Sequence, residues 1–298
     1  MNKKLGMIGL LVIACLVSAI DVSASAIILK EDGWDWSTGT AWTGDAVPGS
    51  DDDAYVRGGR SVDVTTDVGS IDQVFIGDST TWGTHGTVNI TAGKLVTTGA
   101  SQVGRQLDGA NGTLKISGGT YQSGGTDGGV AMLIGADTTS ASTTGILEIS
   151  GTGTFIGRAI IGSTQAGDSG DVFRIKGSNA TVGNTSTAGS NSLEFRSGTM
   201  EWIFDATGAS TANFQEIVTF GAGSDGIVVD GSAYTGGVNT FTLLNAGVLS
   251  GTAPTINLIG FAEGTTYEWS STTDTFKVTT AVPEPATVGM LGLGALAM

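Results

Sequence analysis

Few side chains in this chain could perform chemistry by themselves. The single histidine, His85, lies in the turn-like segment 83–86, so nucleophilic triads and histidine metal sites lack their usual component. The single cysteine, Cys15, lies in an apolar N-terminal run, which leaves the rest of the chain without disulfides or thiolate metal sites. We therefore expect no catalytic residue, no metal site and no cofactor, and hence no enzyme.

The densest run of carboxylates is formed by Asp51, Asp52 and Asp53. Such a run could bind calcium through carboxylate oxygens, or it could be a solvated turn. Sugar-cleaving β-helices use carboxylate pairs, or aspartate-bound calcium beside Lys or Arg, gathered on one outer face. This acidic run lies instead in the loop that enters the repeats, so the sequence favours a solvated turn. A polysaccharide lyase or hydrolase remains the alternative function.

A more regular set of polar residues recurs along the chain, each between two apolar residues. With spacings of 26, 33, 26 and 20, these are Asn89, Lys115, Glu148, Arg174 and Glu194. If their strands stack in register, neighbours lie ~4.8 Å apart and their charges alternate in sign after Asn89. We predict a ladder that fixes register rather than an active face, with Lys115 reaching Glu148, Glu148 reaching Arg174 and Arg174 reaching Glu194.

The elements that carry this ladder are short strands with a period of two. A second phrase, an apolar β-branched residue followed by glycine, recurs with spacings of 27, 31, 27 and 21. Its copies are Ile76-Gly77, Val103-Gly104, Ile134-Gly135, Ile161-Gly162 and Val182-Gly183. Two phrases that recur together indicate one unit copied about five times. The expected inward column is Ile90, Ile116, Ile149, Ile175 and Phe195.

One such unit is too small to fold alone. Its roughly five inward side chains contribute about 10 kcal/mol if each contributes about 2, whereas ordering ~25 residues of backbone costs about 25 kcal/mol or more. Stacked units share one core. The sequence therefore predicts an all-β fold, a right-handed parallel β-helix (β-solenoid) with N- and C-terminal caps.

Composition agrees with this fold class and limits the partners. Glycine accounts for 49 of the 298 residues, about twice the ordinary share, which suits many tight turns. The net charge of −15 opposes binding to the phosphates of nucleic acid, so we expect no nucleic-acid partner.

We divide the chain into five segments. Residues 1–26 form a secretory signal peptide with the small residues Ala24 and Ala26 before the cleavage point. Residues 27–64 hold Trp34, Trp36 and Trp42, interpreted either as a cap with the first strands or as a sugar-stacking platform of a carbohydrate-binding module. The repeat array spans 65–205, closing rungs and a C-terminal β cap span 206–280, and 281–298 form a sorting or anchor segment.

The last segment resembles a known sorting signal. Pro283, Glu284 and Pro285 precede a run of 13 apolar or small residues, 286–298, which is shorter than the ~20 needed to span a bilayer as a helix. This arrangement resembles the PEP-CTERM signal of Gram-negative bacteria that make exopolysaccharide, although the family's terminal Arg cluster has no counterpart. The resemblance implies processing by an exosortase-like enzyme and partial membrane anchoring through this segment.

Segments 42–56 and 241–251 resemble parts of β-helical surface proteins with autotransporter-associated repeats. Together the resemblances imply an exported protein, processed by signal peptidase and located at the cell surface or outside the cell. We therefore expect a non-enzymatic structural or adhesive protein, with exopolysaccharide as its candidate partner. A carbohydrate-binding module remains an alternative beside the lyase or hydrolase.

Overall fold

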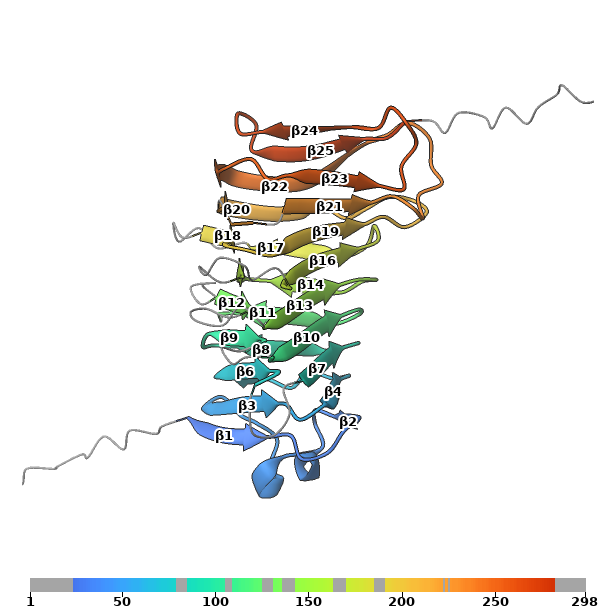
Figure 1. Cartoon of the computed structure of the whole chain (residues 1–298). Helices are drawn as coiled ribbons and strands as arrows, with labels where there is room; N and C mark the ends of the chain where they lie inside the picture. The colour runs from blue at the N-terminus through green and yellow to red at the C-terminus, as the bar shows by residue number, and fades with distance from the viewer. Residues whose placement is uncertain are drawn as a thin grey trace, which may run out of the picture.

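The alternation of apolar and polar residues produces a column of parallel strands rather than a globular sandwich. The computed structural model describes residues 24–78, 85–104, 109–124, 131–135, 143–162, 170–184, 191–221, 223–224 and 226–281. In these residues the chain is nearly all β and winds into a solenoid of about seven turns (Figure 1). The predicted parallel β-solenoid is confirmed.

The strands form three faces, named here face A, face B and face C. Face A contains β1 (Ser25–Ile28), β3 (Asp52–Val56), β6 (Gln73–Ile76), β9 (Ser101–Val103), β12 (Ala131–Ile134), β15 (Arg158–Ile161) and β18 (Asn191–Phe195). Face B contains β2 (Trp34–Asp35), β4 (Arg60–Val64), β7 (His85–Ile90), β10 (Asn111–Ile116), β13 (Thr144–Ile149), β16 (Val172–Lys176), β19 (Thr199–Ile203), β21 (Gly226–Asp230) and β23 (Ile256–Ile259). Face C contains β5 (Ser70–Ile71), β8 (Lys94–Thr97), β11 (Thr120–Ser123), β14 (Thr154–Ile156) and β17 (Thr181–Asn184).

Two long strands join faces C and A near the C-terminal end. The first half of β20 (Ala212–Phe220) pairs with β17 and its second half with β18, and β22 (Thr240–Gly251) continues the stack on β20. The register shifts between Phe214 and Ile217, as in a β-bulge, and such a bulge lets one strand bend from one face to the next.

The parallel stack ends in an antiparallel hairpin. β25 (Thr275–Thr279) pairs antiparallel with β22, and β24 (Thr266–Ser270) pairs antiparallel with β25. Parallel pairing runs from β1 on β3 to β21 on β23. Parallel rungs therefore extend beyond the predicted 65–205 array, both before residue 65 and after residue 205. At the other end, two 3-10 turns, η1 (Gly39–Ala41) and η2 (Thr43–Asp45), lie below the first rung.

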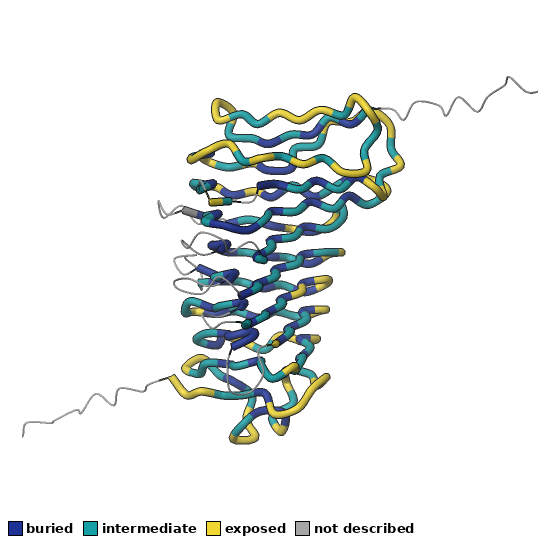
Figure 2. The backbone as a smooth tube through the Cα atoms, in the orientation of Figure 1, coloured by how far each residue is buried: buried dark blue, intermediate teal, exposed yellow. Residues whose placement is uncertain are grey.

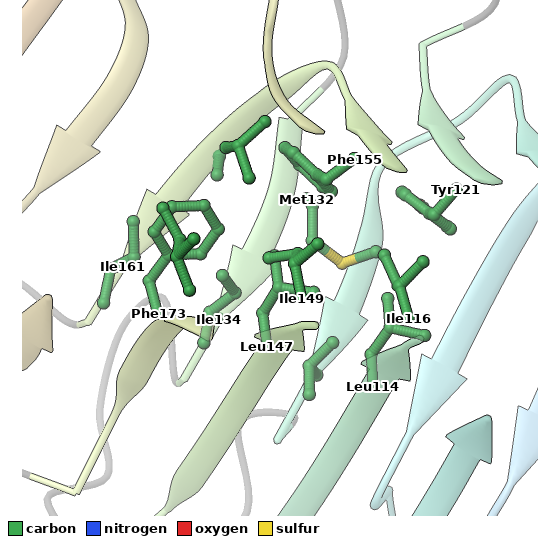
Figure 3. Packing of buried hydrophobic residues seen from close by; sticks show 14 of the residues in the cluster. Leu114, Ile116, Tyr121, Met132, Ile134, Leu147, Ile149, Phe155, Ile161 and Phe173 are labelled. Atoms are coloured by element: carbon green, nitrogen blue, oxygen red, sulfur yellow. The ribbon is translucent and has the colours of Figure 1, made fainter. Parts of the chain in front are cut away.

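The core is a set of inward columns of apolar side chains (Figure 3), and buried residues alternate with partly buried ones along the strands (Figure 2). On face B, Ile90, Ile116, Ile149 and Ile175 pair in sequence, as predicted. The next member is Trp202 of β19 and not Phe195. All five of these residues are fully buried.

The prediction for Phe195 is wrong because Phe195 belongs to face A. It pairs with Ile161 and with Phe220, and its ring stacks on that of Phe220 with centroids 4.8 Å apart and an interplanar angle of 4°. The segment 192–195 has the alternation of a face B strand, but alternation alone does not distinguish faces.

The last copy of the glycine phrase was also misplaced. The first four copies end strands of face A, where Gly77, Gly104, Gly135 and Gly162 all have positive φ. Val182-Gly183 instead lies within β17 of face C. There Val182 pairs with Phe155 and extends the column of Leu95, Tyr121 and Phe155.

Glycine is required near the start of three face B strands, β7, β10 and β13. A Cβ added to Gly112 would lie 2.2 Å from the carbonyl oxygen of Ile76 and 2.3 Å from the backbone nitrogen of Gly104. Gly86 and Gly145, its register neighbours, meet equally close backbone atoms. The corner between faces A and B is therefore closed by direct backbone contact.

Candidate functional site

The predicted charge ladder exists on face B. The outward residues that pair in register are Asp63, Asn89, Lys115, Glu148, Arg174 and Glu201. The predicted register neighbours from Asn89 to Arg174 are confirmed, but the predicted Lys115–Glu148 ion pair is wrong, because Glu148 pairs with Arg174 and Lys176 instead. Glu194 is wrong: it lies on β18 of face A, where Arg196 Nε donates to it at 2.9 Å and Arg158 Nη2 lies 3.8 Å away. Glu201 takes its place.

Arg174 is the centre of the ladder. Its Nε donates to Glu201 Oε2 at 2.5 Å and its Nη1 to Glu148 Oε2 at 3.2 Å, while Lys176 Nζ lies 3.5 Å from Glu148 Oε1. Burial disfavours the charged guanidinium, but the hydrogen bonds and charges of Glu201 and Glu148 outweigh it and raise the pKa of Arg174. Both carboxylates are therefore engaged with cations.

Lys115 differs from this pattern. Its side chain is exposed, and it forms no ion pair with any residue that the structure describes, although Glu148 is its register neighbour. Glu148 is turned toward Arg174 and Lys176. The ladder continues toward the N-terminus through an uncharged donor, because Asn89 Nδ2 donates to Asp63 Oδ1 at 2.9 Å.

A double-mutant cycle should separate the two parts of the ladder. We expect a coupling energy of about 1 kcal/mol between Arg174→Gln and Glu201→Gln, reduced in high salt, since the pair is short but partly hydrated. The matched cycle of Lys115→Gln with Glu148→Gln should give a coupling near zero. Equal couplings in urea denaturation would contradict the observed pairing.

The tryptophans of the first segment divide into two groups. Trp36 and Trp42 are fully buried, their ring centroids lie 4.7 Å apart, and Trp42 Nε1 donates to the Trp36 carbonyl at 2.9 Å. Trp34 on β2 is 39% exposed. Trp36 and Trp42 therefore close the first rung, as the cap interpretation predicted, and the three rings form no common exposed platform.

The acidic run does not converge on one point. Asp52 Oδ2 accepts a hydrogen bond from the backbone N–H of Gly49 at 2.8 Å, and Asp52 and Asp53 are consecutive in β3, so they point to opposite sides. In the described residues, no group of three or more His, Cys, Asp or Glu side chains could hold a metal ion. His85 lies on the outer side of face B, with its Nε2 3.0 Å from Asn111 Nδ2.

The predicted processing sites lie at the two ends. Pro283, Glu284 and Pro285 fall outside the described residues. Ala24 and Ala26 are exposed, and Ala26 belongs to β1 opposite Asp53, so cleavage after Ala26 would leave Ile27 and Ile28 of that strand. No helix in the described part of the chain is long and apolar enough to cross a membrane.

Asp205 organises a corner that sequence reasoning missed. It follows β19 and accepts hydrogen bonds from the N–H and hydroxyl of Ser178 at 2.8 and 2.7 Å, and from those of Thr207 at 2.7 and 2.6 Å. Burial disfavours the carboxylate, but these bonds outweigh it and hold the pKa of Asp205 well below its usual range. The sequence signal was an Asp-x-Thr triplet, typical of an Asx turn.

Asp205 should make stability depend on pH. A carboxyl whose pKa is lower in the folded state stabilises the fold above its unfolded pKa of about 4 and loses that contribution as pH falls below it. We expect Asp205→Asn to cost about 1–2 kcal/mol at pH 7 and less at pH 3, measured by urea denaturation. Asp67→Asn, at an exposed residue, is the control, and a cost that does not change with pH would contradict the assignment.

Face C carries a shallow groove near its C-terminal end. Two adjoining hollows of about 230 and 510 Å³ share Asn213 and Gln215 in their walls. Gly183, Ala246 and Gly247 also line the groove, and their small or absent side chains leave it hollow. Exposed amides of Asn213, Gln215 and Asn245 line the groove, and uncharged amides of this kind can hydrogen-bond sugar hydroxyls.

No family model, curated protein or solved structure matches the chain. Function is therefore inferred from the geometry of the described residues and from the sequence signals at the two ends.

Proposed function

We propose that this chain is an exported, non-enzymatic structural or adhesive β-solenoid of the bacterial surface or its polysaccharide matrix. The observation that carries the proposal is the position of Arg174 between Glu148 and Glu201, at 3.2 and 2.5 Å. Both carboxylates at the centre of face B, Glu148 and Glu201, are bonded to Arg174, which suits a stiff scaffold. A catalytic face would present at least one carboxylate to solvent or substrate.

The two ends of the chain would determine its cellular location. The signal peptide 1–26, cleaved after Ala26, would direct export, and Pro283, Glu284 and Pro285 would direct an exosortase-like enzyme to the C-terminal segment. The mature chain would then be at the cell surface, held in part at the membrane through 283–298. These assignments rest on the sequence and on the resemblance to PEP-CTERM proteins.

An adhesive role is favoured by the groove on face C. Its amides offer donors and acceptors without charge, which fits the hydroxyl groups of a neutral glycan. A carbohydrate-binding module is therefore the second candidate function. The lyase or hydrolase has no comparable support among the described residues.

Location can be tested by expressing the full chain in an exopolysaccharide-producing Gram-negative host and fractionating the cells. We expect surface or extracellular material that lacks residues 1–26, and less surface retention after deletion of 283–298. A cytoplasmic chain that keeps Met1 would contradict export. Identical surface retention after the deletion would contradict the sorting role alone.

Activity is tested separately, with a glycan array and a reducing-end assay on the purified chain. We expect binding or no interaction, but no cleavage of polysaccharide. Cleavage that disappears in Glu148→Gln while thermal stability is unchanged would show that face B is an active face. The structural proposal would then be wrong.

A further inference from the structure

The C-terminal end of the column is uneven. On the side of faces C and A, β25 and then β24 continue the stack beyond β22, whereas face B stops at β23. Figure 1 shows the two hairpin strands lying beyond β23. Face B is therefore shorter than the side opposite it, and β23 is an edge strand that pairs, among the described residues, with β21 alone.

The backbone of β23 has hydrogen-bonding groups that are directed away from β21. The carbonyl oxygens of Thr255 and Ile259 accept hydrogen bonds of 2.8 Å from N–H groups in the rung of β21. Successive residues of a strand direct their N–H and C=O groups to opposite sides. Ile256 and Leu258 therefore direct theirs toward the free edge, which leaves two donors and two acceptors for another strand.

The apolar side chains at this edge are incompletely covered. From β4 to β21, the inward pair of every face B strand is buried, and Ile227 and Val229 of β21 are 1% and 0% exposed. Ile256 and Leu258, their register neighbours on β23, are partly exposed instead. The cover that these two side chains lack is what a further face B strand would supply.

The hairpin presents aromatic residues at the same end of the column. Tyr267 and Trp269 of β24 lie opposite Val278 and Phe276 of β25, both of which are fully buried. Residues opposite one another in an antiparallel pair share a face of the sheet, so Tyr267 and Trp269 are also on the core side. Tyr267 is nevertheless 51% exposed and Trp269 is partly exposed. Apolar surface is therefore open on both sides of this end.

Charge distinguishes the edge of β23 from the other edges. Residues 231–262, which include β23, contain no Asp, Glu, Lys or Arg, although the chain has a net charge of −15. In the edge strand β1 the N–H of Ile28 donates to Thr43 Oγ1 at 2.9 Å, and β24 carries the exposed Glu268 at its centre. Covered or charged edges prevent strand addition in soluble proteins, and within the described residues β23 has neither protection.

We propose that the free edge of β23 binds an extended polypeptide segment of another protein by strand addition. The segment would hydrogen-bond to the backbone of Ile256 and Leu258 and place apolar side chains, at alternate positions, against the open end of the core. Because no charge lies along 231–262, the segment would itself be uncharged, since a charge there would lose hydration without gaining a partner. This inference goes beyond the proposed function and does not depend on export or sorting.

Nuclear magnetic resonance of the purified full chain tests the proposal. The probe is a peptide with the sequence of residues 252–262 and blocked ends, which is uncharged and forms a face B rung in this protein. We expect saturating peptide to slow the solvent exchange of the N–H groups of Ile256 and Leu258 at least tenfold. The N–H groups of Asn257 and Ile259, which face β21, should not change. The same peptide with Leu258→Asp should bind at least tenfold more weakly.

Leu258→Pro in the full chain should block the edge. It removes the N–H that faces the free edge and keeps the bonds to β21, because proline is tolerated where the N–H of an edge strand faces solvent. We expect at least tenfold weaker binding of the peptide. Tyr267→Ala should weaken binding severalfold through lost apolar contact. Trp34→Ala is the matched control, at an aromatic residue that is 39% exposed at the opposite end, and it should bind like the wild type.

Three results would overturn the proposal. Equal peptide binding by the wild type and Leu258→Pro would place the peptide elsewhere. Slow exchange at Ile256 and Leu258 without peptide would show that the edge is already covered, by a second copy if sedimentation gives twice the 29.9 kDa of one chain and by the chain itself if it gives a monomer. If Leu258→Pro does not fold, the wild type decides: no protection of these two N–H groups by saturating peptide rejects the site.

Discussion

Replacing Trp202 with alanine is expected to lower the free energy of unfolding by about 3–5 kcal/mol. Trp202 is fully buried in the inward column of face B, between Ile175 and Val229. Its ring centroid lies 5.9 Å from that of Phe276 in the C-terminal hairpin. Its removal would open a cavity where the parallel rungs meet that hairpin, and the effect can be measured by guanidinium denaturation.

Trp202→Phe is the informative control. The indole Nε1 of Trp202 is buried without a hydrogen-bond partner, so phenylalanine keeps an aromatic ring and removes an unsatisfied donor. We expect a loss below about 1.5 kcal/mol, typical of aromatic repacking. Losses of equal size in the two variants would mean that the ring's volume does not stabilise the column.

Gly112→Ala should be nearly as damaging, at about 2–3 kcal/mol, although it adds one methyl group. That methyl group would lie 2.2 Å from the Ile76 carbonyl oxygen, so two neighbouring turns would have to separate. The cost is steric, because Gly112 is not among the glycines with positive φ. Thermal denaturation followed by circular dichroism measures it.

Gly237→Ala provides the comparison. Gly237 is exposed, is not among the glycines with positive φ, and no atom lies within 4 Å of an added Cβ. We expect slight stabilisation, within about 0.5 kcal/mol, from reduced freedom of the unfolded chain. Similar losses at positions 112 and 237 would contradict the close contact at the corner.

The sequence predicted the fold because the spacing between copies reports the length of one turn. The prediction of the fifth copy, Ser192 to Phe195, was wrong for a physical reason. The corner between β18 and β19 has only three residues, 196–198, so strands of two faces follow one another closely and both alternate apolar and polar residues. Counting 27 residues onward from Arg174 leads to Glu201 within Met200-Glu201-Trp202, and this spacing would have identified the correct strand.

The candidate sites were less predictable than the fold. The ladder could be predicted from the alternation of apolar and polar residues. That Glu148 pairs with Arg174 and not with Lys115 depends on side-chain geometry, which cannot be deduced from the spacing.

The hairpin of β24 and β25 gives the two ends of the column different folding kinetics. Ser270 pairs with Thr275 across residues 271–274, whereas Asn111 pairs with His85, 26 residues earlier in the chain. Closing a short loop loses less chain entropy, and hairpins form within microseconds. The C-terminal hairpin can therefore close early and dock on β22, while each parallel rung must wait for a whole turn of chain to return to the rung before it.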